Sequence, residues 1–210
     1  MDKLEKIPEV DEVFVVTNSK FVGHFKSWKE TNKSRKKMTI VDDGTLRNED
    51  RLGAIGDIHF VLQNENIKDD VLVVAGDNLF EFSLKKFVDF YKKKKGSIIA
   101  AYDLKDRKKL AHKYGVVELD GEGRIVHFEE KPAKPKTSLA STACYIFSKD
   151  DLKKVPDYIQ RSDRYDNPGD FIKWLNEKSP VYGFTFIEKW FDIGSFEALE
   201  EAYEAYGKKQ

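Results

Sequence analysis

The sequence has little of what marks a secreted or membrane protein. It contains one cysteine, Cys144, in 210 residues, which excludes a disulfide framework and favours a reducing compartment. No apolar run is long enough to cross a bilayer, and no leader is visible. We therefore expect a cytoplasmic protein without a membrane partner.

The chain also lacks a charge imbalance. Its 37 basic and 37 acidic residues give a formal net charge of +0, so no global field attracts nucleic acid, and any phosphate site must be local. The four histidines show no metal-ligand spacing, which argues against zinc. No Gly-x-Gly-x-x-Gly motif follows a predicted strand, which argues against a dinucleotide-binding protein.

The order of the predicted elements indicates an α/β fold. Hydrophobic residues make up 40% of the chain and aromatic residues 13%, enough for one large core. In the first half, apolar runs alternate with helical patterns, which favours a Rossmann-like, mixed and mostly parallel sheet with helices on both faces. The strands expected there are 13–16, 38–41 and 71–75, and the helices are 2–6, 21–29, 51–63 and 84–91.

The second half is richer in strands and contributes a small antiparallel portion. Residues 120–124 are typical of a tight hairpin, because glycine accepts positive φ without a Cβ clash. Pro156 is expected in a turn that leads into a polar loop. Because no internal repeat is found, residues 1–210 are interpreted as a single domain. The strands expected are 97–103, 115–119, 125–128, 141–147 and 181–187, and the helices are 170–178 and 196–206.

The apolar run 71–75 ends abruptly in Gly76, Asp77 and Asn78. This pattern predicts a buried strand that delivers one carboxylate to an edge of the sheet. In open α/β sheets, ligands bind just beyond the carboxyl ends of the strands. Asp77 is therefore the first candidate site residue.

Glu129, Glu130 and Lys131 place charge at the end of another predicted strand. Pro132 stops that strand because it cannot donate to a ladder. Lys131 could meet a phosphate there. The alternative interpretation, an exposed strand end, also fits the motif taken alone.

Asp192 follows an aromatic pair and precedes a glycine turn and the last predicted helix. Asp77 and Asp192, converging on one cleft, would form the oxygen-rich site that suits Mg²⁺ when the ion also keeps waters and substrate phosphates. Each aspartate taken alone is also explained as a helix N-cap.

Taken jointly and in this order, the motifs resemble the sugar-nucleotidyltransferase family, whose members join a sugar 1-phosphate to a nucleoside triphosphate and release pyrophosphate. Each stretch is weak alone, but the ordered set is specific and covers nearly the whole chain. The matching stretches are 71–80, 114–124, 128–132, 141–147 and 190–194.

The resemblance implies catalytic roles for three residues. Asp77 and Asp192 would hold the catalytic Mg²⁺, and Lys131 would contact the sugar phosphate. An oxygen of the sugar phosphate would attack the α-phosphorus of the triphosphate in line, with UTP or dTTP as the expected donor. Such a transfer needs alignment and charge neutralisation more than a protein nucleophile.

The resemblance also implies a sugar pocket. Glu130 would bind sugar hydroxyls, and Gly115 would let the backbone approach the sugar. Thr142 and Tyr145 lie where the family lines this pocket.

The base-recognition segment departs from the family pattern, because its two glycine-containing halves are separated. Gly44 or Gly53 would approach the base closely, and Arg51 would serve a phosphate. Arg51 is equally well explained as a surface helix residue. The identity of the base does not follow from these residues.

The amino-terminal hallmark of the family is a first strand that runs into a glycine-rich loop with a basic residue. Nothing before Val13 matches it, so we expect a domain that is incomplete at its amino terminus relative to the family. A truncated chain or misassigned start is favoured over a natural remnant and over a strand supplied by a partner.

The leading hypothesis is a Mg²⁺-dependent sugar-1-phosphate nucleotidyltransferase. The alternative is a noncatalytic subunit or remnant that binds a sugar phosphate or a nucleotide. Both hypotheses need small-molecule partners and no nucleic acid, and both are compatible with a homo-oligomer.

Overall fold

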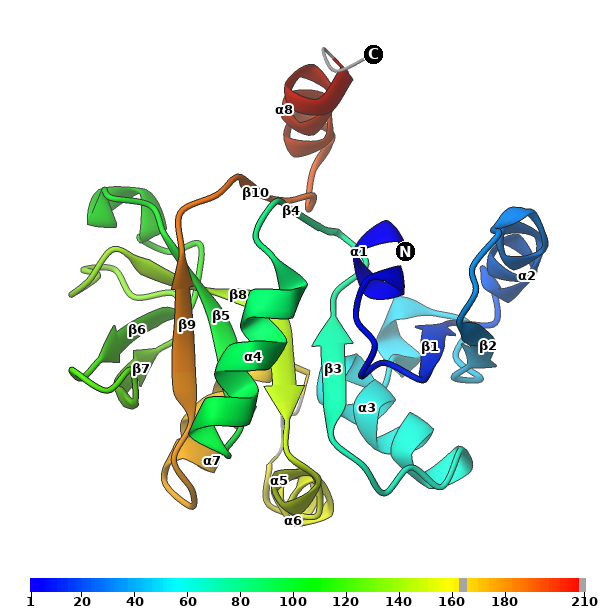
Figure 1. The fold of residues 1–210 in the computed structure, drawn as a ribbon, viewed down its shortest axis with the longest axis horizontal. Coiled ribbons are helices and arrows are strands. Elements are labelled where there is room, and N and C mark those ends of the chain that lie inside the picture. The colour runs from blue at the N-terminus through cyan, green and yellow to red at the C-terminus, as the bar shows by residue number, and fades with distance from the viewer. Residues whose placement is uncertain (163–165, 208–210) are drawn as a thin grey trace. The chain divides into compact units, whose positions relative to one another are not determined.

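The computed structural model describes residues 1–162 and 166–207 (Figure 1). Contacts within the chain divide it into two compact units. Unit 1 comprises Met1–Asp69 and Lys149–Trp174, and unit 2 comprises Asp70–Ser148 and Leu175–Gln210.

Unit 1 is built on a parallel strand pair. β1 (Glu12–Thr17) and β2 (Lys37–Asp42) pair in register from Glu12 with Lys37 to Thr17 with Asp42, and α2 (Val22–Thr31) forms the crossover between them. The remaining elements are α1 (Asp2–Glu5), η1 (Asn48–Asp50), α3 (Gly53–Asn64), α5 (Lys149–Leu152), α6 (Val155–Arg161) and the greater part of α7 (Pro168–Asn176).

Apolar side chains of α3, α6 and α7 form the core of unit 1. Ile55 on α3 is completely buried. The ring of Tyr158 lies 5.1 Å from that of Phe171 and 5.3 Å from that of Trp174, within the range of favourable aromatic pairs. These ring contacts join α6 to α7, and both helices are distant from α3 in the sequence.

Unit 2 contains a six-stranded sheet with the order β7-β6-β8-β5-β9, in which β3 also pairs with β8. A separate two-stranded ladder joins β4 to β10. The strands are β3 (Val71–Val74), β4 (Asn78–Phe80), β5 (Ile98–Asp103), β6 (Val116–Leu119), β7 (Ile125–Glu129), β8 (Leu139–Phe147), β9 (Tyr182–Phe186) and β10 (Trp190–Asp192).

The mixed α/β class predicted from the sequence is confirmed, but antiparallel pairing takes a larger share than expected. Among the described strands, β1 with β2 and β5 with β9 are the parallel pairs. The long strand β8 is the reason, because it runs antiparallel to β3, β5 and β6. The hairpin expected at 120–124 is present, with Gly123 at φ 80° between β6 and β7.

The core of unit 2 lies between the sheet and α4 (Leu84–Lys94), which crosses one face of it (Figure 1). Residues 98–101 of β5 are fully buried, as expected for a strand covered on both faces. Phe82 packs its ring 4.4 Å from that of Phe186 and 5.8 Å from that of Phe87. Ser83 caps α4 by accepting the Lys86 N–H at 3.3 Å, as the sequence predicts.

Three elements differ from the sequence-based expectation. Asn78–Phe80 and Trp190–Asp192 are short strands that pair only with each other, although the first was expected to begin a helical pattern. Pro156 was expected in a turn, but it lies in the first turn of α6. The missing N–H of a proline costs no hydrogen bond there, because N–H groups of the first turn have no acceptor within the helix. The other elements that complete unit 2 are η2 (Arg107–Leu110) and α8 (Phe196–Gly207).

Among the residues that the structure describes, no helix combines the length and the apolar character needed to cross a membrane. The cytoplasmic location stays a prediction.

We predict that Phe82→Ala lowers the free energy of unfolding by about 3–5 kcal/mol, because it opens a cavity among packed aromatic rings. Urea unfolding followed by circular dichroism measures the loss. The matched control is Phe196→Ala, since Phe196 is 84% exposed and should cost less than about 0.5 kcal/mol. Equal losses in the two variants would contradict this description of the core.

Candidate active site

The pairing of β4 with β10 brings Asp77 and Asp192 together. Asp192 lies opposite Asn78 in this ladder, and the Ile193 N–H donates to the Asp77 carbonyl oxygen at 2.9 Å. The Asp77 side chain is exposed, whereas Asp192 is half-buried. The two candidate metal ligands therefore come from distant segments and lie next to each other.

Asn78 fixes this arrangement. Its side chain is buried at 9% exposure, and its amide nitrogen donates to Asp77 Oδ1 at 2.8 Å. Its amide oxygen accepts a 2.7 Å hydrogen bond from Trp190 Nε1. A buried amide is costly to leave unpaired. The bond from Trp190 therefore supports the pairing of β4 with β10, and the bond to Asp77 orients that carboxylate.

The electrostatics of the pair follow from this geometry. Burial and the neighbouring Asp77 carboxylate raise the pKa of Asp192, while Lys131 opposes the rise. Lys131 is therefore close enough for its charge to act on Asp192. An acid whose pKa is raised by a second acid in a partly buried setting is typical of a functional site.

Lys131 is placed by its backbone. Its N–H donates to the Tyr114 carbonyl oxygen at 3.2 Å, and its φ is 47°, a left-handed conformation uncommon for lysine. The Tyr114 ring packs 5.1 Å from that of Trp190. Burial first, and then the charge of Asp192, raise the pKa of the Tyr114 phenol. The ends of β7 and β10 and the start of β6 thus meet at one place.

Gly115 and Glu130 are also brought together. A Cβ placed on Gly115 would lie 2.8 Å from Phe128 Cζ and 2.9 Å from Glu130 Oε2, so any other residue would require these side chains to shift. The Gly115 carbonyl oxygen accepts the Ser141 N–H at 2.8 Å, which ties it to β8. The close approach of a sugar to the backbone at Gly115 stays a prediction.

Thr142 and Tyr145 lie on β8 and are buried. The Thr142 hydroxyl donates to the Ala100 carbonyl oxygen at 2.9 Å, so its proton is already used within the sheet. Burial raises the pKa of the Tyr145 phenol, and the nearby Glu130 carboxylate adds to the rise. Tyr145 is therefore linked electrostatically to the predicted sugar-binding acid.

The three residues expected near the base lie in unit 1. Gly44 and Gly53 have positive φ values of 80° and 75°, which glycine accepts without strain. Arg51 forms a salt bridge with Asp166. A Cβ on Gly53 would lie 2.6 Å from the Asp166 Cα, so Gly53 is required by packing.

Asp57 on α3 is a residue that sequence reasoning missed. Its Oδ1 is shielded from solvent and has no hydrogen-bond partner within residues 1–162 and 166–207. Burial, and after it the charges of Asp43 and Asp166, raise the pKa of Asp57 to about 6. The sequence did contain one signal for Asp57, since this acid lies beside Gly56 on the buried side of a predicted helix.

Comparison with known proteins shows the family to which this chain belongs. The family model described as nucleotidyl transferase matches residues 4–209. The chain belongs to the nucleotidyl transferase family.

Curated relatives and solved structures agree with this family. Glucose-1-phosphate adenylyltransferase of Clostridium acetobutylicum is 34% identical over 138 residues, covering 63% of this chain and 35% of the relative. The same enzyme of Thermotoga neapolitana is 35% identical over 143 residues, covering 66% and 33%. The match thus spans about a third of the length of these relatives. The resemblance to sugar nucleotidyltransferases read from the sequence is confirmed.

The fold of the family is shared with solved structures. A putative glucose-1-phosphate thymidylyltransferase from Bacillus anthracis superposes with a TM-score of 0.73 at 19% identity, covering 97% of this chain and 79% of that chain. A UDP-glucose pyrophosphorylase complexed with UDP-glucose superposes with a TM-score of 0.69 at 21% identity, covering 93% and 75%. These likenesses show the nucleotidyl transferase fold, and the roles of individual site residues stay predictions.

We predict that Asp57→Asn changes the pH dependence of stability. The pKa of Asp57 is raised from 3.8 to about 6, so the stability associated with its protonated form is complete below pH 3.8 and is lost as the pH rises through 6. Asparagine stays neutral and avoids the loss. Asp57 is partly exposed, so the variant should gain only about 1 kcal/mol relative to the wild type above pH 6.

Thermal unfolding between pH 3.5 and 7.5 measures this change. Asp43→Asn removes only the repulsion between the Asp43 and Asp57 charges. It should therefore raise the stability above pH 6 by less than Asp57→Asn does. Parallel pH profiles for the wild type and Asp57→Asn would contradict the burial of this carboxyl.

Proposed function

We propose that this protein transfers a nucleotidyl group from a nucleoside triphosphate to a sugar 1-phosphate and releases pyrophosphate. The proximity of Asp77, Asp192 and Lys131 is the observation that supports this function. Among the relatives named above, the printed names share glucose and differ in the nucleotide. Glucose 1-phosphate is therefore the first acceptor to test, and UTP, dTTP and ATP are the donors to compare.

The residues present suit a divalent cation. Asp77 and Asp192 repel each other when both are ionised, and a cation between them would remove that repulsion. Among the described residues, no group of three or more histidine, cysteine, aspartate or glutamate side chains is arranged to hold a metal. A pair of carboxylates matches Mg²⁺, which usually keeps several waters and binds substrate phosphates. When bound, Mg²⁺ would supply charge neutralisation at the phosphates.

The side chains of the site have distinct tasks in the proposed reaction. Lys131 binds the phosphate of the sugar and offsets its charge, while the Glu130 carboxylate accepts hydrogen bonds from sugar hydroxyls. Gly115 leaves room for the sugar beside the backbone. An oxygen of the sugar phosphate forms the new bond to the α-phosphorus, and the bond between that phosphorus and the bridging oxygen of pyrophosphate breaks. The chain contributes alignment, so no covalent intermediate with the protein is required.

We predict that Asp192→Ala lowers kcat/KM by roughly 10²-fold or more, because it removes one of two carboxylates that position the charge-neutralising cation. A coupled assay of pyrophosphate release measures turnover with glucose 1-phosphate, Mg²⁺ and each of UTP, dTTP and ATP. The matched control is Asp89→Ala, an aspartate that pairs with Lys85 on the surface of α4, and its activity should equal that of the wild type.

Unchanged turnover in Asp192→Ala would show that the metal site is misassigned. If the wild type releases no pyrophosphate with any sugar phosphate, the catalytic proposal fails. Calorimetric titration with glucose 1-phosphate then tests the alternative, a noncatalytic binding protein, which requires sugar-phosphate binding without turnover.

A further inference from the structure

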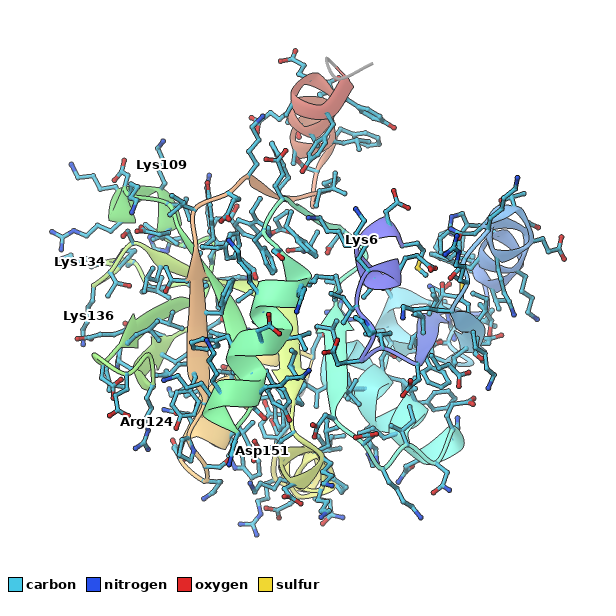
Figure 2. The ribbon with its side chains drawn as sticks, viewed as in Figure 1. Lys6, Lys109, Arg124, Lys134, Lys136 and Asp151 are labelled. Carbon is cyan, nitrogen blue, oxygen red and sulfur yellow. The ribbon has the colours of Figure 1, made fainter. Side chains whose placement is uncertain are left out.

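Helix α8 in unit 2 presents two large aromatic side chains to solvent. Phe196 is 84% exposed and Tyr203 is 69% exposed, although the other side of the helix is anchored. On that side Ala202 is buried, and the Tyr206 ring lies 5.9 Å from the Phe191 ring of β10. Figure 2 shows side chains that project from α8 away from the sheet of unit 2. Exposed aromatic surface of this kind is typical of an interaction site.

The exposed side of α8 is also acidic. Residues 196–207 contain four glutamates and neither lysine nor arginine. Glu200 follows Phe196 by four residues and precedes Tyr203 by three, so these side chains form one stripe along the helix. Among the residues that the structure describes, Glu200 and Glu204 form no salt bridge. This stripe therefore combines aromatic surface with uncompensated negative charge.

Helix α2 in unit 1 exposes a second aromatic stripe. The helix has no buried residue, and Val22 is its one half-buried residue. Phe21, Phe25 and Trp28 follow one another at intervals of four and three residues, which places their exposed rings on one side. The Phe25 and Trp28 rings meet edge to face, with 6.3 Å between their centroids. A helix that buries no face against its own unit is open to a partner.

The surroundings of the α2 stripe are basic. Residues 20–37 contain seven lysines and arginines but a single acidic residue, Glu30. The Lys20 ammonium lies 5.2 Å from the centroid of the Phe21 ring. Lys29 is exposed, and it takes part in no salt bridge within residues 1–162 and 166–207. The stripe on α2 is thus opposite in charge to the stripe on α8.

The two stripes are matched in length as well as in charge. Trp28 follows Phe21 by seven residues, as Tyr203 follows Phe196. Two α8 helices facing each other would bring glutamates together, and two α2 helices would bring lysines together, so like charges oppose both pairings. Pairing α8 with α2 buries aromatic rings and joins opposite charges. Because every copy carries both helices, a second copy of this chain meets both requirements.

We propose that α8 of one copy docks on α2 of a second copy of this chain. The aromatic rings of the two helices pack together, and the glutamates of α8 face the lysines of α2. One helix on another makes a small interface, so the association is reversible and about micromolar in affinity. The contact uses none of the candidate catalytic residues, Asp77, Lys131 and Asp192.

Sedimentation velocity of the whole chain, from about 1 μM to about 500 μM, measures this association. The sedimentation coefficient of the wild type should rise with concentration, and the rise should shrink in about 0.5 M NaCl. The double variant Phe196→Ala, Tyr203→Ala should associate at least about tenfold more weakly. The matched control, Leu46→Ala with Val126→Ala, removes exposed apolar side chains elsewhere and should stay within about threefold of the wild type.

A variant of α2 identifies the partner surface. Phe25→Ala with Trp28→Ala should weaken association as strongly as the α8 variant does. An equal mixture of the two variants should associate again, because one supplies an intact α2 and the other an intact α8. If either double variant by itself associates as tightly as the wild type, two copies of the same helix meet instead, and the proposal is wrong.

A charge exchange provides a second test that leaves the aromatic rings in place. Glu200→Lys with Glu204→Lys should weaken association by at least about tenfold, and mixing this variant with Lys26→Glu, Lys29→Glu should restore it. A mixture that fails to associate would contradict the proposed charge pairing. A wild type that sediments as a single chain at every concentration, or a control variant weakened as much as the α8 variant, would overturn the proposal.

Discussion

The short antiparallel ladder between β4 and β10 is the constraint on which the candidate site depends. It joins Asn78–Phe80 to Trp190–Asp192, and its register places Asp192 opposite Asn78. A two-stranded ladder of this length is marginal by itself in water. The buried Asn78 amide reinforces it by bonding to Asp77 and to the Trp190 indole. One polar side chain therefore both orients the Asp77 carboxylate and links β4 to β10.

This arrangement has an electrostatic cost. Burial and Asp77 raise the pKa of Asp192, which means that the folded chain is less stable with both acids ionised than with one of them protonated. Lys131 offsets part of this cost, and its left-handed backbone adds local strain. Such unfavourable features at a strand end are expected where binding of a charged ligand takes precedence over stability. Asp57 in unit 1 is a second acid whose pKa is raised by burial and by neighbouring acids.

The sequence predicted the elements with strong local patterns. The strand before Asp77, the helix capped by Ser83 and the hairpin at 120–124 are confirmed because periodicity, caps and glycines act over a few residues. β4 and β10 were missed because three-residue strands exist only through their partner, which lies far away in the sequence. The turn predicted at Pro156 was wrong because a proline is compatible with both a turn and the first turn of a helix.

The site itself was predicted only in part. The family resemblance selected Asp77, Asp192 and Lys131, and in the structure the charges of Asp77 and Lys131 both act on Asp192. It could not indicate that Asn78 and Trp190 hold the acids in place, since that role depends on burial and on a long-range hydrogen bond.

The central claim is that Asp77 and Asp192 act together as one cation site. Titration with Mn²⁺, followed by electron paramagnetic resonance, tests it in the wild type, Asp77→Asn, Asp192→Asn and the double variant. We predict that each single substitution weakens binding by about tenfold or more and that the double variant is little weaker than either one. Independent effects that multiply in the double variant, or Mn²⁺ binding that neither substitution changes, would contradict it.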